Sequence, residues 1–301
     1  MKNVSVIGLG IMGLRAAILL RDSGFEVQGH DPFPAAAQRA AKEGIRVFET
    51  PGDSAAGVTT VIMFVPGPSQ TESVVTGLGG ILEKAVTGLT VVNSSTVDPG
   101  TNIRMSEKAA SAGIHFLDAP LLGRPSGAGT WSFLVGGELS TLEKAMPVLE
   151  VLSGSQSRIF HMGRLGNGNK AKLLNNLMFG AINACTAEVM ALASHLGVPQ
   201  KALFDAAVAA GASVVSNLYK ELAPRIIDGR FDDPNFTVDM LLKDNKLALA
   251  MAQDAGAPLV VGASVDWLNR MASAHGLGAE DTAAMGKLFT ALWSGSKSPM
   301  Q

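Results

Sequence analysis

The chain has 301 residues, a length typical of two domains or of one large one. Hydrophobic residues make up 47% and charged residues 17%, so the chain can bury a large core and its composition excludes intrinsic disorder. The net charge of −2 provides no basic surface, so we expect no nucleic-acid and no membrane partner.

The cysteine and histidine content excludes two further classes of site. Cys185 is the only cysteine, so an internal disulfide is excluded and a reducing, cytoplasmic location is expected. We expect Cys185 to lie on a long helix and to pack in the hydrophobic core of the protein. Paired histidines at metal-ligand spacing are not present, which predicts chemistry without a metal. The apolar stretch 4–20 is interrupted by glycines and by Arg15, so it predicts neither a signal peptide nor a membrane span.

The two halves of the chain have different hydrophobic periods. Up to about residue 162, short β-branched runs alternate with amphipathic stretches, which predicts a parallel sheet covered by helices. The expected strands are residues 3–8, 26–30, 60–64, 90–93, 115–119 and 133–136, and the expected helices include 13–23, 34–43 and 101–112. After about residue 165 only helical patterns follow, at 170–196, 199–209, 238–255 and 259–275. The glycine-rich stretch 163–168 joins the halves.

A glycine motif follows the first expected strand and opens the first expected helix. It has the GxGxxG pattern Gly8-Leu9-Gly10-Ile11-Met12-Gly13. Gly8 permits a tight turn, Gly10 lets a pyrophosphate approach the backbone, and Gly13 permits close packing of helix on strand. The helix N-terminus adds N–H groups and partial positive charge for phosphate. An ordinary glycine-rich turn is the alternative.

Asp31 ends the second expected strand. Its carboxylate can accept hydrogen bonds from both ribose hydroxyls of an adenosine, and it would repel a 2′-phosphate. Pro32 and Phe33 follow it, so no arginine is placed there to bind such a phosphate. We therefore expect NAD in preference to NADP. The alternative is an aspartate that only caps the next turn.

A lysine and an asparagine share one face of the long helix expected from residue 170. Lys172 and Asn176 are four residues apart among apolar neighbours, where polar groups are costly to bury without a partner. A lysine ammonium can protonate the oxygen of a carbonyl that accepts hydride, and the neutral amine can perform the reverse step. Asn176 can hold the reacting oxygen. A solvated helix edge with an extended Lys172 is the alternative.

Several motifs together resemble the β-hydroxyacid dehydrogenases. Besides the glycine motif and Gly166 to Asn176, which is similar to the family's GxGxxxKxxNN, three further stretches match. They are Asn93-Ser94-Ser95-Thr96-Val97-Asp98-Pro99, Asp118-Ala119-Pro120-Leu121-Leu122-Gly123-Arg124-Pro125 and Leu242-Lys243-Asp244. The resemblance covers the whole chain. It implies a Rossmann-like doubly wound domain over residues 1–163, a long interdomain helix from about residue 168, and an all-helical domain over residues 164–301.

The resemblance also implies roles for single residues. Lys172 is similar to the family's catalytic lysine, and Asn176 to its substrate-binding partner. Ser95 would contact substrate. The implied cofactor contacts are Ile11, Met12, Asp31, Val65, Thr96 and Lys243. The alternatives are helix capping or turn chemistry for Ser95 and Thr96, and for Lys243 an exposed lysine paired with Asp244 or Asp239.

The chain departs from the family where a substrate carboxylate is bound. The family's Ser-Gly-Gly is Leu122-Gly123-Arg124 here, so a hydroxyl is lost and a guanidinium fork is gained. We expect Arg124 to hold the anionic end of a small hydroxy acid or aldehyde acid other than 3-hydroxyisobutyrate, with Trp131 shaping the pocket. A surface arginine paired with an acid is the alternative.

These features predict an NAD-dependent oxidoreductase that interconverts a small 3-hydroxy acid and its aldehyde or keto acid. An imine reductase and a non-catalytic NAD(P)-sensing module of the same fold are the alternatives, and both usually lack the lysine. 6-Phosphogluconate dehydrogenase would need a larger helical domain. Apolar stretches of the helical half favour a homodimer or homotetramer.

Overall fold

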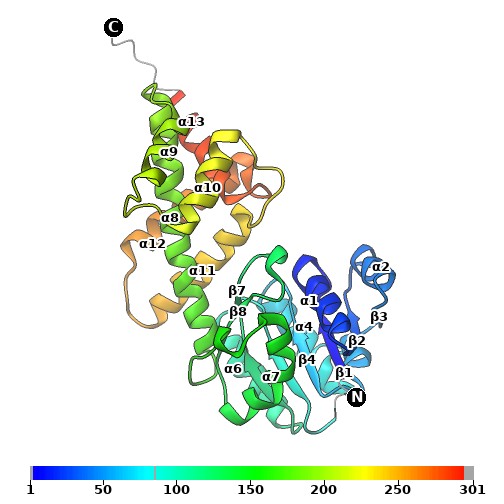
Figure 1. Ribbon diagram of the computed structural model, residues 1–301. Helices are drawn as coiled ribbons and strands as arrows, with labels where there is room; N and C mark the ends of the chain where they lie inside the picture. Colours follow the sequence, from blue (N-terminus) through cyan, green and yellow to red (C-terminus); the bar gives the residue numbers. More distant parts are fainter. Residues whose placement is uncertain (1–2, 85, 295–301) are drawn as a thin grey trace. The chain divides into compact units, whose positions relative to one another are not determined.

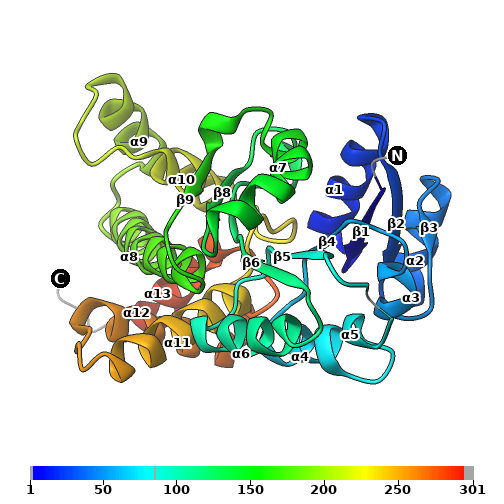
Figure 2. The same ribbon diagram turned by 90° about the horizontal axis from the view of Figure 1, so that it is seen from below.

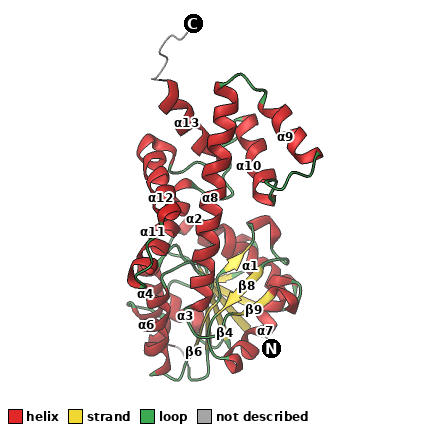
Figure 3. Cartoon of the chain, turned by 90° about the vertical axis from the view of Figure 1, so that its left-hand side faces the viewer, coloured by secondary structure: helices red, strands yellow, loops and turns green. Residues whose placement is uncertain are grey.

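The structure is a computed structural model that describes residues 3–84 and 86–294 (Figure 1). The chain forms two compact units, Met1–Lys172 and Leu173–Gln301. Among the described residues, all named strands lie in the first unit and the second is helical, as the colours of Figure 3 show. The prediction of an α/β first half and a helical second half is confirmed.

A parallel six-stranded sheet forms the centre of the first unit, with the strand order β3-β2-β1-β4-β5-β6. Its strands are β1 (Asn3–Ile7), β2 (Glu26–His30), β3 (Arg46–Val47), β4 (Thr60–Met63), β5 (Thr90–Asn93) and β6 (His115–Asp118). The chain begins in the middle of the sheet and winds outward in both directions, which is the doubly wound Rossmann arrangement. A smaller sheet follows, made of β7 (Leu121–Leu122), β8 (Ser132–Val135) and β9 (Ile159–His161).

Helices cover both faces of the six-stranded sheet (Figure 2). One face carries α1 (Ile11–Asp22) and α7 (Leu139–Ser153), and the other α3 (Pro51–Ala55), α4 (Pro68–Thr76), α5 (Ile81–Lys84) and α6 (Pro99–Ala110). The remaining helical segments are α2 (Pro34–Lys42), η1 (Pro125–Gly127) and η2 (Gln156–Arg158). Strand residues alternate between two cores, with Ile62 in one and Val61 and Met63 in the other. Because both faces are buried, the central strands β4 and β5 are buried at every position and mostly apolar, which made them recognisable in the sequence.

The second unit is built from helices around a core of its own. Its elements are α8 (Asn167–His195), which begins within the first unit, then α9 (Gln200–Ala209), α10 (Asn217–Asp228), α11 (Val238–Asp254), α12 (Val260–Ala272), the π-helical turn η3 (Ser273–Leu277), η4 (Thr282–Ala284) and α13 (Met285–Ser294). Its core includes Ala187, Val238, Met285, Leu288 and Phe289.

Some boundaries and burials differ from the predictions. α8 begins at Asn167, three residues before the predicted start, and the predicted helix 259–275 ends as regular α-helix at Ala272. The short strands β3, β7 and β9 were not predicted, because two or three residues are too few to show a period. The prediction of a core position for Cys185 is wrong: it is exposed, while Ala184 and Ala187 on the same helix are buried.

α8 is long and apolar enough to cross a membrane by length and composition alone. Of its most apolar stretch, 44% is buried inside the protein, and Asn176 and Asn183 are among its buried residues. A core helix of a soluble protein has the same properties, so α8 is weak support for a membrane location.

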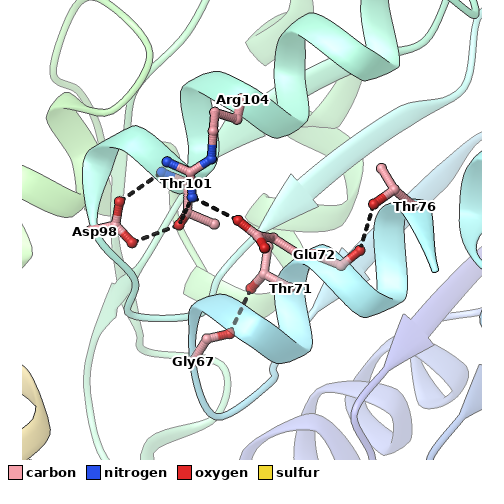
Figure 4. Close-up of polar contacts among 7 residues, drawn as sticks. All are labelled: Gly67, Thr71, Glu72, Thr76, Asp98, Thr101 and Arg104. Atoms are coloured by element: carbon pink, nitrogen blue, oxygen red, sulfur yellow. Dashed lines mark hydrogen bonds and ion pairs between the residues drawn. The ribbon is translucent and has the colours of Figure 1, made fainter.

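The start of α6 shows how the first unit caps a helix that leaves the sheet (Figure 4). The Asp98 carboxylate accepts hydrogen bonds from Thr101 N at 2.8 Å and from Thr101 Oγ1 at 2.6 Å. Arg104 lies beside them and forms an ion pair with Glu72 at 2.6 Å, between side chains that are both about half exposed.

We predict that Asp98→Ala lowers the free energy of unfolding by about 1 kcal/mol, because the N-cap of α6 is lost. Arg104→Ala is the matched control and should cost less than about 0.5 kcal/mol, since the ion pair it removes is solvated. Urea unfolding followed by circular dichroism measures both. A larger loss for Arg104→Ala than for Asp98→Ala would contradict this account.

Candidate active site

The glycine motif forms the turn between β1 and α1. Gly8 has φ = +87°, and a β-carbon on Gly13 would lie 1.7 Å from the Gly8 carbonyl oxygen, so a side chain at either position would disrupt the turn. A β-carbon on Gly10 would meet no described protein atom within 4 Å. Gly10 is the N-cap of α1 and has no side chain to bond the N–H groups of the first turn. Ile11 is 71% exposed beside it. The turn therefore fits a pyrophosphate against the helix N-terminus.

Asp31 follows β2 and is held by the backbone on both sides. Its Oδ2 accepts a hydrogen bond from Leu9 N at 2.7 Å and its Oδ1 accepts one from Phe33 N at 2.9 Å. Asp31 lies at a shallow pocket whose other lining residues are Pro32, Pro34, Ala37, Val47, Phe48 and Glu49. A carboxylate beside a mostly apolar pocket fits an adenosine, whose ribose is polar and whose base is flat and apolar on its faces.

Val65 and Ser95 lie together beyond the carboxyl ends of β4 and β5. The Val65 N–H donates to Ser95 Oγ at 2.8 Å, and the Ser95 N–H donates to Asn93 Oδ1 at 3.1 Å. Ser95 is buried, whereas the next residue, Thr96, is partly exposed. β1 and β4 are neighbours in the sheet although the chain leaves them in opposite directions, and ligands of such sheets bind at this switch point.

Lys172 lies against the segment that departs from the family pattern. Its Nζ donates a hydrogen bond to the Leu121 carbonyl oxygen at 2.9 Å, and Leu122, Gly123 and Arg124 follow directly. The structure therefore places the lysine amine next to the start of this loop. Lys172 is partly buried, so a fully solvated helix edge does not describe it.

Trp131 supports the same loop from within the core. Its side chain is fully buried, its Nε1 donates to the Arg124 carbonyl oxygen at 2.8 Å, and a β-carbon on Gly123 would lie 2.4 Å from its ring. Trp131 thus fixes the backbone of Gly123 and Arg124. Because its side chain is fully buried, Trp131 can shape a pocket there only through the position of this backbone, and not as part of the pocket's surface.

In the second unit, Asn176 and Lys243 both bond to Asp244. Asn176 Nδ2 donates to Asp244 Oδ2 at 2.6 Å, and Lys243 Nζ lies 2.9 Å from Asp244 Oδ1. Asn176 and Asp244 are buried, with 4% and 3% of their surface exposed. The sequence analysis named Asp244 only as an alternative partner of Lys243, and the structure forms that ion pair. It orients the amide of Asn176 and neutralises Lys243.

Asp118 is a residue that the sequence analysis left without a role. It ends β6, is fully buried, and accepts backbone hydrogen bonds from Gly166 N and Asn169 N, both at 2.7 Å. Burial raises the pKa of the Asp118 carboxyl to about 6, against the opposing effect of these hydrogen bonds. Its place in the Asp-Ala-Pro motif was the available signal. Among the residues that the structure describes, no group of three or more His, Cys, Asp or Glu side chains is placed to hold a metal ion.

Comparison with known proteins gives the family. Residues 3–163 match the family model described as the NAD binding domain of 6-phosphogluconate dehydrogenase. Residues 166–289 match the model described as NAD-binding of NADP-dependent 3-hydroxyisobutyrate dehydrogenase. The chain belongs to the β-hydroxyacid dehydrogenase family. It is thus an NAD(P)-dependent oxidoreductase that acts on CH–OH groups.

Individual relatives of this β-hydroxyacid dehydrogenase align over nearly its full length. The chain is 32% identical to an L-threonate dehydrogenase of Cupriavidus necator, over 96% of each chain. It is also 32% identical to a 3-hydroxyisobutyrate dehydrogenase of Pseudomonas aeruginosa, over 87% of this chain and 89% of the other. The crystal structure of a 3-hydroxyisobutyrate dehydrogenase from Salmonella typhimurium has a TM-score of 0.86 at 26% identity, over 96% and 100% of the chains.

Imine reductases share the fold at a greater distance. An imine reductase structure from Pseudomonas sp. has a TM-score of 0.62 at 24% identity, over 95% of this chain and 98% of the other. Similarity at this level shows the architecture alone. The dehydrogenase relatives therefore carry more weight for the chemistry.

We predict that the stability of this dehydrogenase falls as pH rises through the Asp118 titration. The folded-state pKa of the Asp118 carboxyl, about 6, lies above the ordinary aspartate value of 3.8, so the folded protein binds the proton more tightly than the unfolded chain. The stabilisation by protonated Asp118 is complete below about pH 4 and is lost by about pH 6, a change of about 3 kcal/mol. Asp118→Asn cannot titrate, so its free energy of unfolding should lose correspondingly less over this range. Urea unfolding at several pH values measures the difference, and parallel pH dependences would contradict it.

Proposed function

We propose that this β-hydroxyacid dehydrogenase interconverts a small 3-hydroxy acid and its aldehyde or keto acid by hydride transfer, with Lys172 as general acid and base. The main support is the 2.9 Å hydrogen bond from Lys172 Nζ to the Leu121 carbonyl oxygen. This bond holds the amine beside the Leu122–Arg124 loop, where the family binds the substrate carboxylate. A lysine amine near the acid group of a hydroxy acid is also near its hydroxyl.

The amine serves the proton half of the reaction. In reduction, the carbonyl carbon gains hydride and the Lys172 ammonium donates a proton to the oxygen; in oxidation, the neutral amine accepts the hydroxyl proton. A bound nicotinamide supplies or accepts the hydride. Asn176, oriented by Asp244, is proposed to hold the reacting oxygen, and Ser95 to position the substrate.

We further propose that the cofactor is NAD rather than NADP. The support is Asp31, whose carboxylate lies beside the apolar pocket and would repel a 2′-phosphate. The proposed cofactor contacts are Gly8, Gly10, Ile11, Met12, Gly13, Asp31, Val65, Thr96 and Lys243. The exposed Ile11 side chain and the open space at Gly10 support a dinucleotide at this turn, because both leave room for it.

The proposed substrate is a small anionic hydroxy acid or aldehyde acid, with Arg124 as its anion clamp. Arg124 follows Gly123, whose position against Trp131 fixes the loop, and a guanidinium binds carboxylate, sulfonate or phosphate through two parallel hydrogen bonds. Relatives named for L-threonate and 2-(hydroxymethyl)glutarate show that the family accepts acids other than 3-hydroxyisobutyrate.

A cytoplasmic homodimer or homotetramer is the assembly that we propose. Cys185 is the only cysteine of the chain, in keeping with a reducing compartment. The helical unit exposes large apolar side chains that a second copy could cover, including Leu174, Met178, Val260, Val261 and Trp267.

We predict that Lys172→Ala lowers kcat by 10²–10⁴-fold, the usual contribution of a general acid or base, while the Kd for NADH changes less than about twofold. Lys170→Ala is the matched control, because Lys170 is on the same helix, two residues earlier, and is exposed. It should retain kcat. The assay is reduction of NAD and of NADP with a panel of 3-hydroxy acids that includes dicarboxylates and sulfonates. Retained turnover in Lys172→Ala would refute the proposed role, and tight NADH binding by wild type with no turnover would favour a non-catalytic module.

We predict that Arg124→Ala raises KM for the preferred acid by about 10- to 100-fold, because a charged hydrogen-bonding partner of the substrate is lost. Arg104→Ala, which removes an exposed arginine paired with Glu72, should leave KM unchanged. Steady-state kinetics of both variants with the same panel decides the point. An unchanged KM of Arg124→Ala for every acid would remove Arg124 from the proposed site.

A further inference from the structure

We propose that Asp118 is a positioning residue for the reaction, which sets the place of the Lys172 amine by holding the first turn of α8. This inference rests on the proposed function of Lys172. It concerns only residues of the first unit, Met1–Lys172. The argument has three parts: how the carboxylate holds the helix, how its own segment is held, and how that segment reaches the amine.

The carboxylate serves as the cap of a helix that has no side-chain cap from the residue just before it. α8 begins at Asn167 and is preceded by Gly166, which has no side chain and a φ of +88°. Asp118 instead accepts the Gly166 N–H with one oxygen and the Asn169 N–H with the other, at 2.7 Å each. The positive end of the helix dipole adds to the attraction for a negative group. The start of α8 is therefore fixed by a residue of the central sheet.

Two glycines allow the backbone to pack closely against the carboxylate. A β-carbon on Gly136 would lie 2.3 Å from Asp118 Oδ1, and one on Gly168 would lie 2.9 Å from Oδ2 and 2.3 Å from the Leu134 carbonyl oxygen. Gly136, directly after β8, and Gly168, in the first turn of α8, thus both lie in close contact with the buried carboxylate. The close fit means that a shift of the carboxylate shifts the helix.

The segment from Asp118 to Leu121 is itself held at three successive places, to β8 and to Gly136 directly after it. Asp118 and Gly136 exchange two backbone hydrogen bonds, of 3.1 and 2.7 Å, and the Leu134 N–H donates to the Pro120 carbonyl oxygen at 3.0 Å. Leu121 then pairs with Phe133 in the antiparallel β7–β8 pair. The segment is a fixed support.

The same segment contacts the helix again at the amine. Lys172 is three residues after Asn169, so the two lie on neighbouring turns of one helix face. Asp118 binds the backbone at Asn169, and the Leu121 carbonyl binds the Lys172 ammonium. Four consecutive residues therefore fix both the helix and the functional end of the lysine side chain that the helix carries. Without the carboxylate, the start of α8 would lose two hydrogen bonds. The Lys172 amine would then no longer be held at hydrogen-bonding distance from the Leu121 carbonyl oxygen.

Kinetics of Asp118→Asn in two backgrounds tests this proposal. An amide keeps the size of the side chain but turns an N–H₂ group toward a backbone N–H donor, so one of the two caps is lost. We expect kcat to fall by about 10- to 100-fold, since a misplacement near 1 Å costs this much, with the Kd for NADH within twofold of wild type. In the Lys172→Ala background, measured as single-turnover hydride transfer, the same substitution should change the rate less than twofold.

Asp281→Asn is the matched control. Asp281 is also buried, with 2% of its surface exposed, and its carboxylate also accepts two backbone N–H groups, those of Asn235 and Ala283, at 2.9 and 3.0 Å. It should lose stability but keep kcat within about twofold. Gly168→Ala is a second variant that keeps the Asp118 charge and crowds its oxygen; it should lower kcat in the same way without weakening NADH binding. Circular dichroism establishes that each variant is folded.

The outcomes separate the two proposals. A folded Asp118→Asn or Gly168→Ala with wild-type kcat, or an equal loss from Asp118→Asn in both backgrounds, would overturn the positioning role and leave the role of Lys172 intact. Full turnover of Lys172→Ala alone would contradict the proposed function and, with it, this inference.

Discussion

A buried carboxylate at the start of the long helix α8 is the contact on which much of the candidate site depends. Asp118 ends a strand of the central sheet and caps α8, which begins at Asn167, by accepting the N–H of Gly166, 48 residues later in the chain. Ionised carboxylates are costly to bury, and this one is tolerated because two backbone N–H groups and the helix dipole compensate it. Burial raises the pKa of the Asp118 carboxyl to about 6, because desolvation outweighs the opposing effect of these hydrogen bonds.

The remaining groups of the first unit are gathered by the order of its strands. In a parallel sheet every strand delivers its carboxyl end to the same edge, so the glycine turn after β1, Asp31 after β2, Val65 after β4 and Ser95 after β5 meet there. The hydrogen bond between Val65 and Ser95 ties two of these loops together. This bond couples the positions of the loops that follow β4 and β5 at the carboxyl edge of the sheet.

Each unit contributes its own pre-formed set of polar groups. The first unit holds the Lys172 amine on the Leu121 carbonyl, and the second holds the Asn176 amide and the Lys243 ammonium on Asp244. One continuous helix, α8, carries both Lys172 and Asn176. Their i, i+4 spacing places both residues on one face of this helix.

The sequence by itself determined the fold class, the glycine turn, the aspartate after the second strand and the pairing of Lys172 with Asn176 on one helix face. Each of these depends on neighbours within a few residues, through hydrophobic period, backbone freedom or helical spacing. Tertiary structure decided the roles of Asp118, Asp244 and Trp131, the exposure of Cys185 and the early start of α8. The stretch Gly166-Asn167-Gly168-Asn169 is unfavourable for helix by propensity, and it is helical from Asn167 because a distant carboxylate satisfies its N–H groups. Such contacts join residues far apart in the chain, and local patterns carry no record of them.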